Sequence, residues 1–422
     1  MQQQFTPRIL HTIVPPHILS SIAERGTLQQ RDRALKSLEL DQYVRAVRSR
    51  SIPLLQAQLP QTAVAKAVGP ERSIYDARHA TDLPGSLIRH EGQTPVTDKA
   101  GNEAYDGLGW TYNFYQQVYS RNSIDNKGLP LDASIHYDVS YNNAFWDGGQ
   151  MVFGDGDSDT FNRFTIALEV IGHELTHGVT GSEANLDYND QPGALNESIS
   201  DVFGSLVKQF SLNQSADQAD WLIGKGLFTD KVQGEALRSM KAPGTAYDDP
   251  VLGKDPQPAT MDGYVDMTDD NGGVHVNSGI PNHAFYLAAI AIGGHAWEKT
   301  GRIWYITLCD RALKPSANFN DFATLTVKHA SALYGANSQE QQAVQKAWEA
   351  VKVLKTSIGT IPTDGTDATT GIVITTPGNT GSSNWPIPDD AEDNAPWQFP
   401  QDTPENLPQD LSEEPDESDA AD

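Results

Sequence analysis

Two histidines and a glutamate stand close together in the stretch GHELTHG, residues 172–178. His173 and His177 are four positions apart, which places both rings on one face of a helix. Two imidazole nitrogens in that arrangement can bind one zinc ion at about 2.0–2.1 Å. Glu174 lies about a third of a turn away, beside the position of a bound water. Because this short pattern also arises by coincidence, a third ligand must decide the matter.

A carboxylate suited to be the third ligand follows in ALNESISD, twenty residues after His177. Glu197 and Asp201 lie one turn apart on the helix that this stretch predicts. Two histidines and a glutamate form a ligand set of catalytic zinc, with a fourth position open. Asp201 is then placed to accept the free ring N–H of His173, and Asn196 is a second candidate support. The alternative is that the two carboxylates only form a solvated helix face.

The residues described above resemble the motifs of a known family. HELTH, the twenty-residue gap and NESISD are similar to the HExxH and ExxxD motifs of the thermolysin family of zinc metallopeptidases. The resemblance implies an α+β fold of two lobes, the first β-rich and the second mainly helical, with the HExxH helix between them. It also implies one catalytic Zn²⁺ bound by His173, His177 and Glu197. The short leader resembles that of the protealysin-like branch.

The resemblance extends to residues that bind substrate. YNNAFWDGGQMVFGDGD resembles the edge strand that pairs with substrate in the family, so Asn143 would bind a substrate amide and Ala144 would contribute its backbone. Arg238, in EALRSM, stands where an arginine binds the substrate carbonyl. The pocket for the residue after the cleaved bond would be lined by Phe161, Phe164, Val170, Ile223, Leu227 and Leu237. A bulky apolar residue is therefore expected there, although some of these positions would be core residues in any protein.

Three further residues complete the implied catalytic set. Tyr188, in LDYND, stands where the family has a tyrosine that supports the transition state, and DDNGGVHVNSG supplies His275 with Asp270 as its orienting partner. Without the resemblance, a loop histidine such as His275 is more often simply solvated. With zinc activating a water, Glu174 would take its proton and later deliver it to the leaving amine. His275 and Tyr188 would stabilise the oxyanion that forms.

One part of the family pattern is missing. The family's double calcium site is a cluster of carboxylates, and only Glu169 and Asp220 stand at those positions here. Lys208, Leu222 and Lys225 occupy the others. Two ammonium groups would repel a divalent cation and could neutralise the two carboxylates in its place. We therefore expect this calcium pair to be absent, while calcium binding elsewhere stays open.

Charge and composition vary along the 422 residues, and the net charge is −26. Such a charge opposes binding to nucleic acid or to an anionic membrane surface. Residues 1–50 nevertheless hold eight basic and four acidic residues, a net of +4, whereas residues 356–422 hold fifteen acids and no base. The composition predicts a short helical propeptide at 1–50, a linker at 51–70, a β-rich lobe at 71–163, a helical lobe at 164–355 and an acidic, Pro-rich disordered tail at 356–422.

The leader itself suggests how the enzyme is controlled and exported. A basic leader on an acidic enzyme indicates an intramolecular inhibitor that is later removed by self-cleavage. His17 could in principle cap the zinc, but beside Pro15 and Pro16 a packing role is more typical. These prolines also interrupt the apolar run of a Sec-type signal, so we expect secretion by another route or an intracellular location.

The sequence as a whole predicts a monomeric zinc endopeptidase. It would cut peptide bonds on the amino-terminal side of bulky hydrophobic residues, in protein or peptide substrates. The alternative is a non-catalytic protein that uses the same fold to bind peptides or a partner. An inactive relative would be expected to have lost Glu174 or His275, and both are present.

Overall fold

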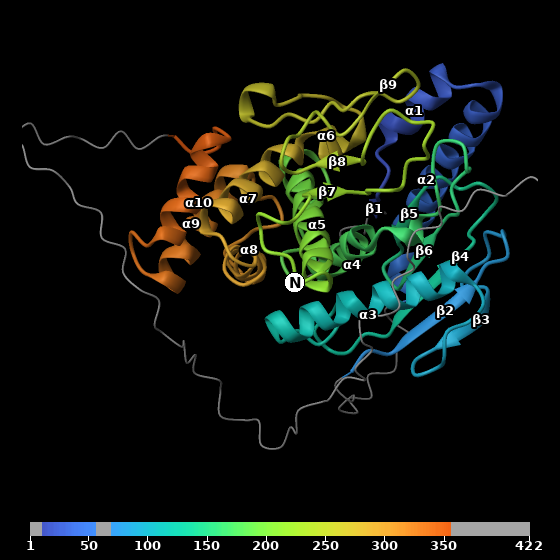
Figure 1. Ribbon diagram of the computed structural model, residues 1–422, viewed down its shortest axis with the longest axis horizontal. Coiled ribbons are helices and arrows are strands. Elements are labelled where there is room, and N and C mark those ends of the chain that lie inside the picture. Colours follow the sequence, from blue (N-terminus) through green and yellow to red (C-terminus); the bar gives the residue numbers. More distant parts are fainter. Residues whose placement is uncertain (1–10, 56–68, 356–422) are drawn as a thin grey trace, which may run out of the picture. The chain divides into compact units, whose positions relative to one another are not determined.

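A mixed sheet forms one side of the molecule in the computed structural model (Figure 1). The structure describes residues 11–55 and 69–355; for residues 11 and 42–55 it describes the backbone only. The sheet has six strands in the order β1-β5-β6-β4-β2-β3. They are β1 His11–Thr12, β2 Arg72–Asp76, β3 Ser86–His90, β4 Leu131–Ile135, β5 Ala144–Trp146 and β6 Gln150–Phe153. The pairs β2–β4 and β4–β6 are parallel, and the others are antiparallel. The edge strand β1 comes from the predicted leader.

A long helix, α3 (Lys99–Tyr119), packs against β2 and β4 and connects the sheet to the helices (Figure 1). The stretch TYNFYQQVYSR, residues 111–121, by itself predicts a helix, but α3 begins twelve residues before it, where the Asp98 side chain accepts the N–H of Gly101. Three glycines lower the helix propensity of its first half. A Cβ at Gly107 would lie 2.3 Å from Ile171 Cδ1, so this glycine is needed for the close approach of the next helix.

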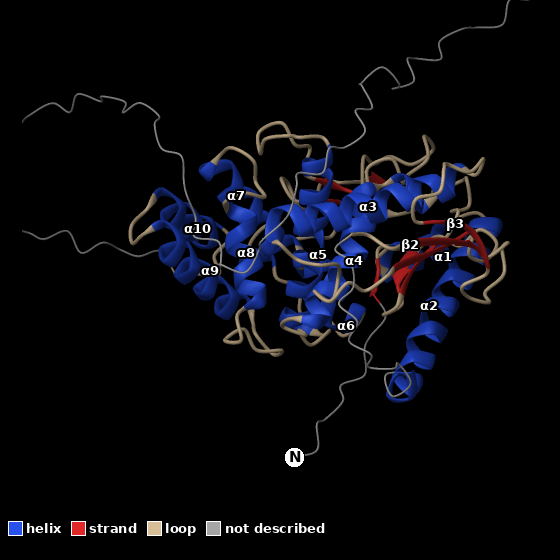
Figure 2. Ribbon diagram, turned by 90° about the horizontal axis from the view of Figure 1, so that it is seen from below, coloured by secondary structure: helices blue, strands red, loops and turns tan. Residues whose placement is uncertain are grey.

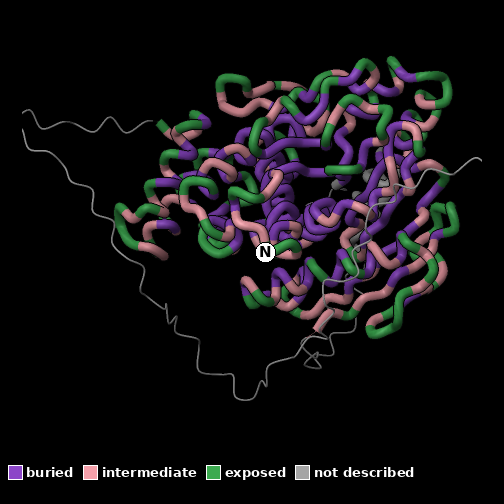
Figure 3. The backbone as a smooth tube through the Cα atoms, in the orientation of Figure 1, coloured by how far each residue is buried: buried purple, intermediate pink, exposed green. Residues whose placement is uncertain are grey.

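Two helices at the centre carry the HExxH and NESISD motifs. They are α4 (Leu168–Ser182) and α5 (Asp190–Ser211), and they pack closely against each other (Figure 2). A Cβ at Gly204 of α5 would lie 2.3 Å from the Glu169 carbonyl oxygen of α4. This contact brings the two backbones close enough for side chains of both helices to meet at one point. Figure 3 shows that this central part is also buried.

The helices that follow α5 form a helical side of the molecule next to the sheet (Figures 1 and 2). They are α6 Asp270–Asn277, α7 Gly279–Ile292, α8 Thr300–Cys309, α9 Phe319–Tyr334 and α10 Gln339–Ala350. The other elements outside the leader are the short strands β7 Leu222–Ile223, β8 Arg238–Ser239, β9 Asp248–Asp249 and β10 Gly253–Lys254, and the 3₁₀ turns Phe164–Ile166 and Met261–Gly263. A β-containing lobe followed by a helical lobe, with α4 between them, confirms the predicted α+β architecture.

The leader forms two helices after β1. Helix α1 (Pro16–Arg25) begins with a proline at its first position, where the missing N–H costs nothing. Helix α2 (Leu28–Leu55) extends five residues past the predicted end of the propeptide. Most of the predicted linker, and the predicted tail, lie outside the described residues. Within the described ranges, none of the helices combines the length and apolar character needed to cross a membrane.

Candidate metal centre and active site

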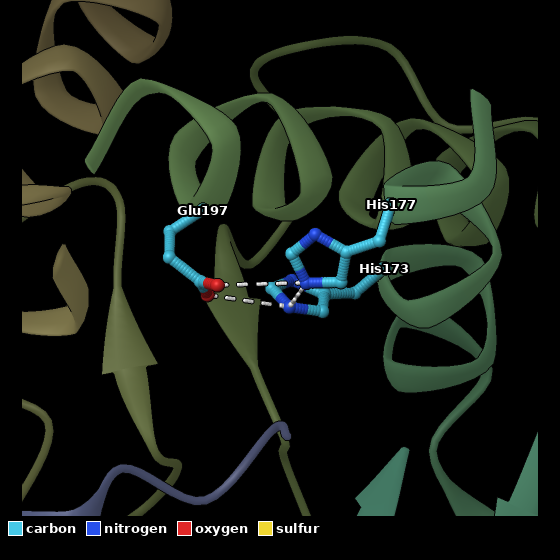
Figure 4. Close-up of side chains that lie close together, drawn as sticks. All are labelled: His173, His177 and Glu197. Carbon is cyan, nitrogen blue, oxygen red and sulfur yellow. Dashed lines mark hydrogen bonds and ion pairs between the residues drawn. The ribbon is translucent and has the colours of Figure 1, made fainter. Parts of the chain in front are cut away.

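Three candidate ligands meet where α4 and α5 cross the middle of the molecule (Figure 4). His173 Nε2 and His177 Nε2 are 3.0 Å apart. Glu197 Oε2 lies 3.5 Å from His173 Nε2, and Glu197 Oε1 lies 3.5 Å from His177 Nε2. Tetrahedral ligands at zinc distances are about 3.3 Å apart, so the spacing of these three side chains fits one zinc ion.

The far sides of both histidine rings are held by other groups, as metal-binding histidines require. His173 Nδ1 lies 2.8 Å from Asp201 Oδ1, and His177 Nδ1 lies 2.9 Å from Asn196 Oδ1. These contacts turn both Nε2 atoms toward Glu197. The two supports named from the sequence are therefore in contact with the ligands.

Asp201 is also the centre of a buried charged network. Arg238 donates to both of its carboxylate oxygens at 2.8 Å, and Asn282 Nδ2 donates to Oδ2 at 2.8 Å. Burial alone would raise the Asp201 pKa, but Arg238 and His173 outweigh it and lower the pKa to about 2. Asp201 is thus a permanent anion behind the ligands. Asn282 lies 81 residues from Asp201 in the sequence, and no local pattern could have indicated it.

Glu174 has the environment of a general base. It is fully buried on α4, and its Oε2 accepts the backbone N–H of Trp146 at 3.1 Å. Its Oε1 has no hydrogen-bond partner among the described residues. Burial is the main cause that raises the Glu174 pKa to about 8. A carboxylate with a pKa near neutrality can both take and return a proton.

His275 reaches the centre from α6 because the start of that helix is kinked. Asn271, Gly272 and Gly273 have φ of 51°, 84° and 76°, conformations that glycine adopts without strain. The kink turns Asp270 back onto His275, whose Nδ1 lies 2.6 Å from Asp270 Oδ1. Burial opposes a charged ring, but Asp270 and Glu197 outweigh it and raise the pKa of His275. The sequence indicated a loop here rather than a kinked helix.

The third predicted catalytic group, Tyr188, lies beside the ligand set. Its hydroxyl donates to Glu197 Oε1, and its ring centroid is 6.4 Å from that of His275. His275 Nε2 is itself 3.4 Å from Glu197 Oε2. Two possible hydrogen-bond donors therefore stand next to the ligand glutamate.

The predicted apolar pocket residues also come together. Phe161, Phe164, Val170, Ile223, Leu227 and Leu237 are all buried and belong to one apolar cluster. The Phe161 and Phe164 rings are 5.7 Å apart, and the backbones of Ile223 and Leu237 are hydrogen-bonded at 2.9 Å. These residues, from three separate segments, are thus part of the main apolar core, and their role as a pocket lining stays a prediction.

Comparison with known proteins identifies the family. Residues 61–181 match the catalytic domain of thermolysin metallopeptidases, and residues 184–353 match the α-helical domain of the same peptidases. An extracellular metalloprotease of Pectobacterium carotovorum subsp. carotovorum is 52% identical over 82% of this chain and 97% of its own. The chain belongs to the thermolysin family of metallopeptidases. It is a metalloendopeptidase, and the resemblance seen in the sequence is confirmed.

Other relatives place this thermolysin-family chain in the protealysin-like branch. Protease PrtS of Photorhabdus sp. (strain Az29) is 48% identical over 81% of this chain and 91% of its own. The solved structure of the precursor of protealysin, a metalloproteinase from Serratia proteamaculans, aligns with a TM-score of 0.74 and 56% identity. That alignment covers 82% of this chain and all of the precursor.

In this thermolysin-family enzyme the leader lies along the predicted substrate strand. Strand β1 pairs antiparallel with β5. The Ile13 N–H donates to the Ala144 carbonyl at 3.2 Å, and the Val14 N–H donates to Asn143 Oδ1 at 3.0 Å. Both residues that were expected to bind the substrate backbone thus bind the backbone of the leader.

Arg238 and His275 also contact leader carbonyls. Arg238 Nη1 donates to the Ile13 carbonyl at 3.1 Å, and His275 Nε2 is 3.1 Å from the Thr12 carbonyl oxygen. The leader therefore occupies the positions where a peptide substrate is expected.

Asp41 of α2 is a further leader contact that the sequence did not indicate. Its carboxylate accepts the Tyr141 hydroxyl at 2.5 Å and Asn143 Nδ2 at 3.0 Å, and it is buried. His17, by contrast, bonds to the Tyr247 hydroxyl at 3.0 Å, which agrees with the packing role. An acidic residue on a basic helix gives no signal of such a contact until the fold is known.

The positions of the family's calcium site hold ion pairs. Lys208 Nζ is 3.1 Å from Asp220 and 3.5 Å from Glu169, and Lys225 Nζ is 3.5 Å from Asp220. Glu169 Oε1 also accepts the backbone N–H groups of Gly224 and Lys225, each at 3.1 Å. The two carboxylates are neutralised by groups of the protein itself.

Proposed function

We propose that this metalloendopeptidase uses one zinc ion, held by His173, His177 and Glu197, to cut peptide bonds before bulky hydrophobic residues. The observation that carries this proposal is the spacing of the three ligand atoms, which lie within 4.8 Å of one another. A bound zinc would polarise the scissile carbonyl and make a water molecule acidic enough to attack it. The residues around it supply the rest of the chemistry.

Glu174 moves the proton in this mechanism. The water that attacks must lose a proton, and the buried Glu174 carboxylate, next to the ligand His173 on α4, is placed to take it. The same group then gives the proton to the leaving amine nitrogen. Its Oε2 is oriented by the Trp146 N–H, so β5 positions the base as well as the substrate.

His275 and Tyr188 act on the charge that develops during the reaction. Both can donate to the oxygen of the tetrahedral intermediate, and such donors act most strongly in a buried site. Asp270 holds the His275 ring by its Nδ1 at 2.6 Å and favours its protonated form. Removal of His275 is expected to lower kcat more than it raises KM.

Substrate orientation comes from the groups that bind the leader backbone. Asn143, Ala144 and Arg238 would bind the two residues that follow the cleaved bond, as they now bind Ile13 and Val14. The apolar cluster around Phe161 and Leu237 would then accept the first of these side chains. Both arguments favour a bulky apolar residue after the bond.

We also propose that the chain is a precursor in which the leader blocks the cleft until self-processing removes it. The leader's contacts with the cleft and the similarity to a protealysin precursor support this. We propose further that the enzyme is a monomer, that it lacks the double calcium site, and that it is secreted. A relative named as extracellular supports secretion.

The non-catalytic alternative is not favoured, because Glu174 and His275 are both present and both lie at the ligand cluster. The test compares zinc-loaded protein with its Glu174→Gln variant on a peptide with one central Leu or Phe. We expect cleavage before that residue only with the unsubstituted protein. Equal zinc content with no cleavage by either protein, after proteolytic removal of the leader, would refute the proposal.

A further inference from the structure

The leader backbone runs along β5 in one defined direction. Thr12 stands opposite Phe145 in the antiparallel pairing of β1 with β5, and His11 stands opposite Trp146. The pairing continues beyond β1 through the N–H groups of Ile13 and Val14. A peptide that adds a strand to a sheet edge is fixed by such bonds in both direction and register.

That register brings one carbonyl to the metal ligands. His275 Nε2 lies 3.1 Å from the Thr12 carbonyl oxygen and 3.4 Å from Glu197 Oε2, so one ring nitrogen contacts both groups. The next carbonyl, that of Ile13, bonds to Arg238 instead. The Thr12–Ile13 peptide is therefore the bond whose carbonyl faces the ligand cluster.

The side chain after this bond has the chemistry that the enzyme is expected to select. Ile13 has no exposed surface and is part of the main apolar core, to which the predicted pocket residues also belong. A β-branched apolar residue thus follows the presented bond. Direction, carbonyl position and side chain all match those of a substrate.

We propose that the Thr12–Ile13 bond is a self-cleavage site of the precursor. This inference rests on the proposed function. Water supplies its oxygen to the Thr12 carbonyl carbon, the C–N bond breaks, and Glu174 passes a proton to the Ile13 nitrogen. The products are a Thr12 carboxylate and an Ile13 amino terminus.

Cleavage at this bond does not release the leader, because its other contacts lie on the carboxyl-terminal side of the cut. Ile18, Leu19 and Ile22 of α1 are fully buried. Asp41 stays bound to Asn143, and Lys36 Nζ stays 2.9 Å from Asp138. The cut leader remains an inhibitor, as a tightly held product does. While residues 11–14 fill the cleft, any other bond of the chain must be cut by a second molecule.

The test follows the full-length, zinc-loaded protein by intact mass and amino-terminal sequencing. We expect a new amino terminus at Ile13 that forms at a rate independent of protein concentration and is absent in Glu174→Gln. Ile13→Asp should lower this rate at least tenfold, Ile13→Leu should retain it, and Leu28→Ala, at an exposed leader position, should not change it. No cut at Thr12–Ile13 in the intact precursor, together with cleavage of a separate Leu-containing peptide by the same protein once another protease has removed the leader, would overturn this inference and leave the proposed function intact.

A second measurement needs no catalysis. In metal-free Glu174→Gln, the amide protons of Ile13 and Val14 should exchange slowly, because they are bonded to Ala144 and Asn143. Asn143→Ala should accelerate exchange at Val14 more than at Ile13. Exchange of both amides at the rate of a free peptide would show that the leader is not held in substrate register, and the inference would fail.

Discussion

The helices α4 and α5 carry two charged clusters that differ in what balances their carboxylates. In the metal centre, the side chains of His173, His177 and Glu197 are at most 1% exposed. In the second cluster, Glu169 is paired with Lys208, whose side chain is 18% exposed. The first cluster consists of groups suited to bind a cation from solution, whereas the second contains its own cation. One helix pair can thus build a reactive site and a purely structural one.

The difference follows from the length and hydration of the side chains. Lysine ends in a hydrated ammonium on a flexible stem, so Lys208 can reach Glu169 and keep contact with water. Imidazole rings are short and rigid, and those of the metal centre are fixed from behind by Asp201 and Asn196. Burying such a ligand set costs free energy of folding. Its ligands are, however, already fixed in the one geometry that a metal ion requires.

The largest effect is expected from a change in the ligand set itself. Glu197→Gln replaces the carboxylate by a neutral amide of nearly the same shape, so zinc binding should weaken at least a hundredfold and peptidase activity should disappear. Zinc content after dialysis and cleavage of a Leu-containing peptide measure both. Glu340→Gln, which only breaks the surface pair with Lys299, is the control. Full zinc content in Glu197→Gln would contradict the assignment of the ligand.

A smaller loss is expected from the support behind the ligands. Asp201→Asn removes the charge that balances Arg238 and orients His173, and such changes typically cost about 10–100-fold in metal affinity or activity. Competition with a zinc chelator and the kcat of the variant measure this effect. Asp201→Glu keeps the charge but should restore little of the lost metal affinity, because its longer side chain does not fit the same contacts. An affinity within twofold of the unsubstituted enzyme would show that Asp201 has only a structural role.

The sequence predicted the metal centre better than its surroundings. Glu197 and Asp201 stand at helical spacing in one short stretch, so local periodicity was enough to place them on one face. Asn282 and Asp41 reach the same region only through tertiary packing, and no local pattern indicates them. The kinked start of α6 and the early start of α3 were missed because their glycines argue against a helix. In each case a contact between distant segments outweighs the local preference.

The next largest effect is expected from the second cluster, in which Lys208 pairs with Glu169 and Asp220. Lys208→Met leaves the buried Glu169 without its nearest cation and should lower the free energy of unfolding by about 1–3 kcal/mol. Thermal or denaturant unfolding with and without Ca²⁺ checks this. The double variant Lys208→Glu/Lys225→Glu should gain a stabilisation by calcium that the unsubstituted protein lacks. If the unsubstituted protein binds two calcium ions tightly and Asp220→Ala abolishes this, the absence of the site is disproved.

A third charged cluster, in the β-containing lobe, consists of two carboxylates and a histidine that is positively charged when it is protonated. His136 lies between Asp155 and Asp98, at 2.8 Å from each. The hydrogen bond to Asp155 is the main cause that raises its pKa, partly opposed by burial, to about 9. The cluster is therefore balanced at neutral pH and loses its positive charge as the pH rises through about 9.

The smallest effect is expected from this histidine, and it should depend on pH. The folded pKa of about 9 lies above the ordinary value of 6.5, so the stabilisation is complete below pH 6.5 and is lost as the pH rises through about 9. Because the three groups are partly exposed, it should amount to about 1 kcal/mol. His136→Asn should therefore be less stable than the unsubstituted protein at pH 6, and the difference in their free energies of unfolding should be smaller at pH 9.5. Chemical unfolding at both pH values measures this difference, and a difference that grows with pH would rule out a charged His136.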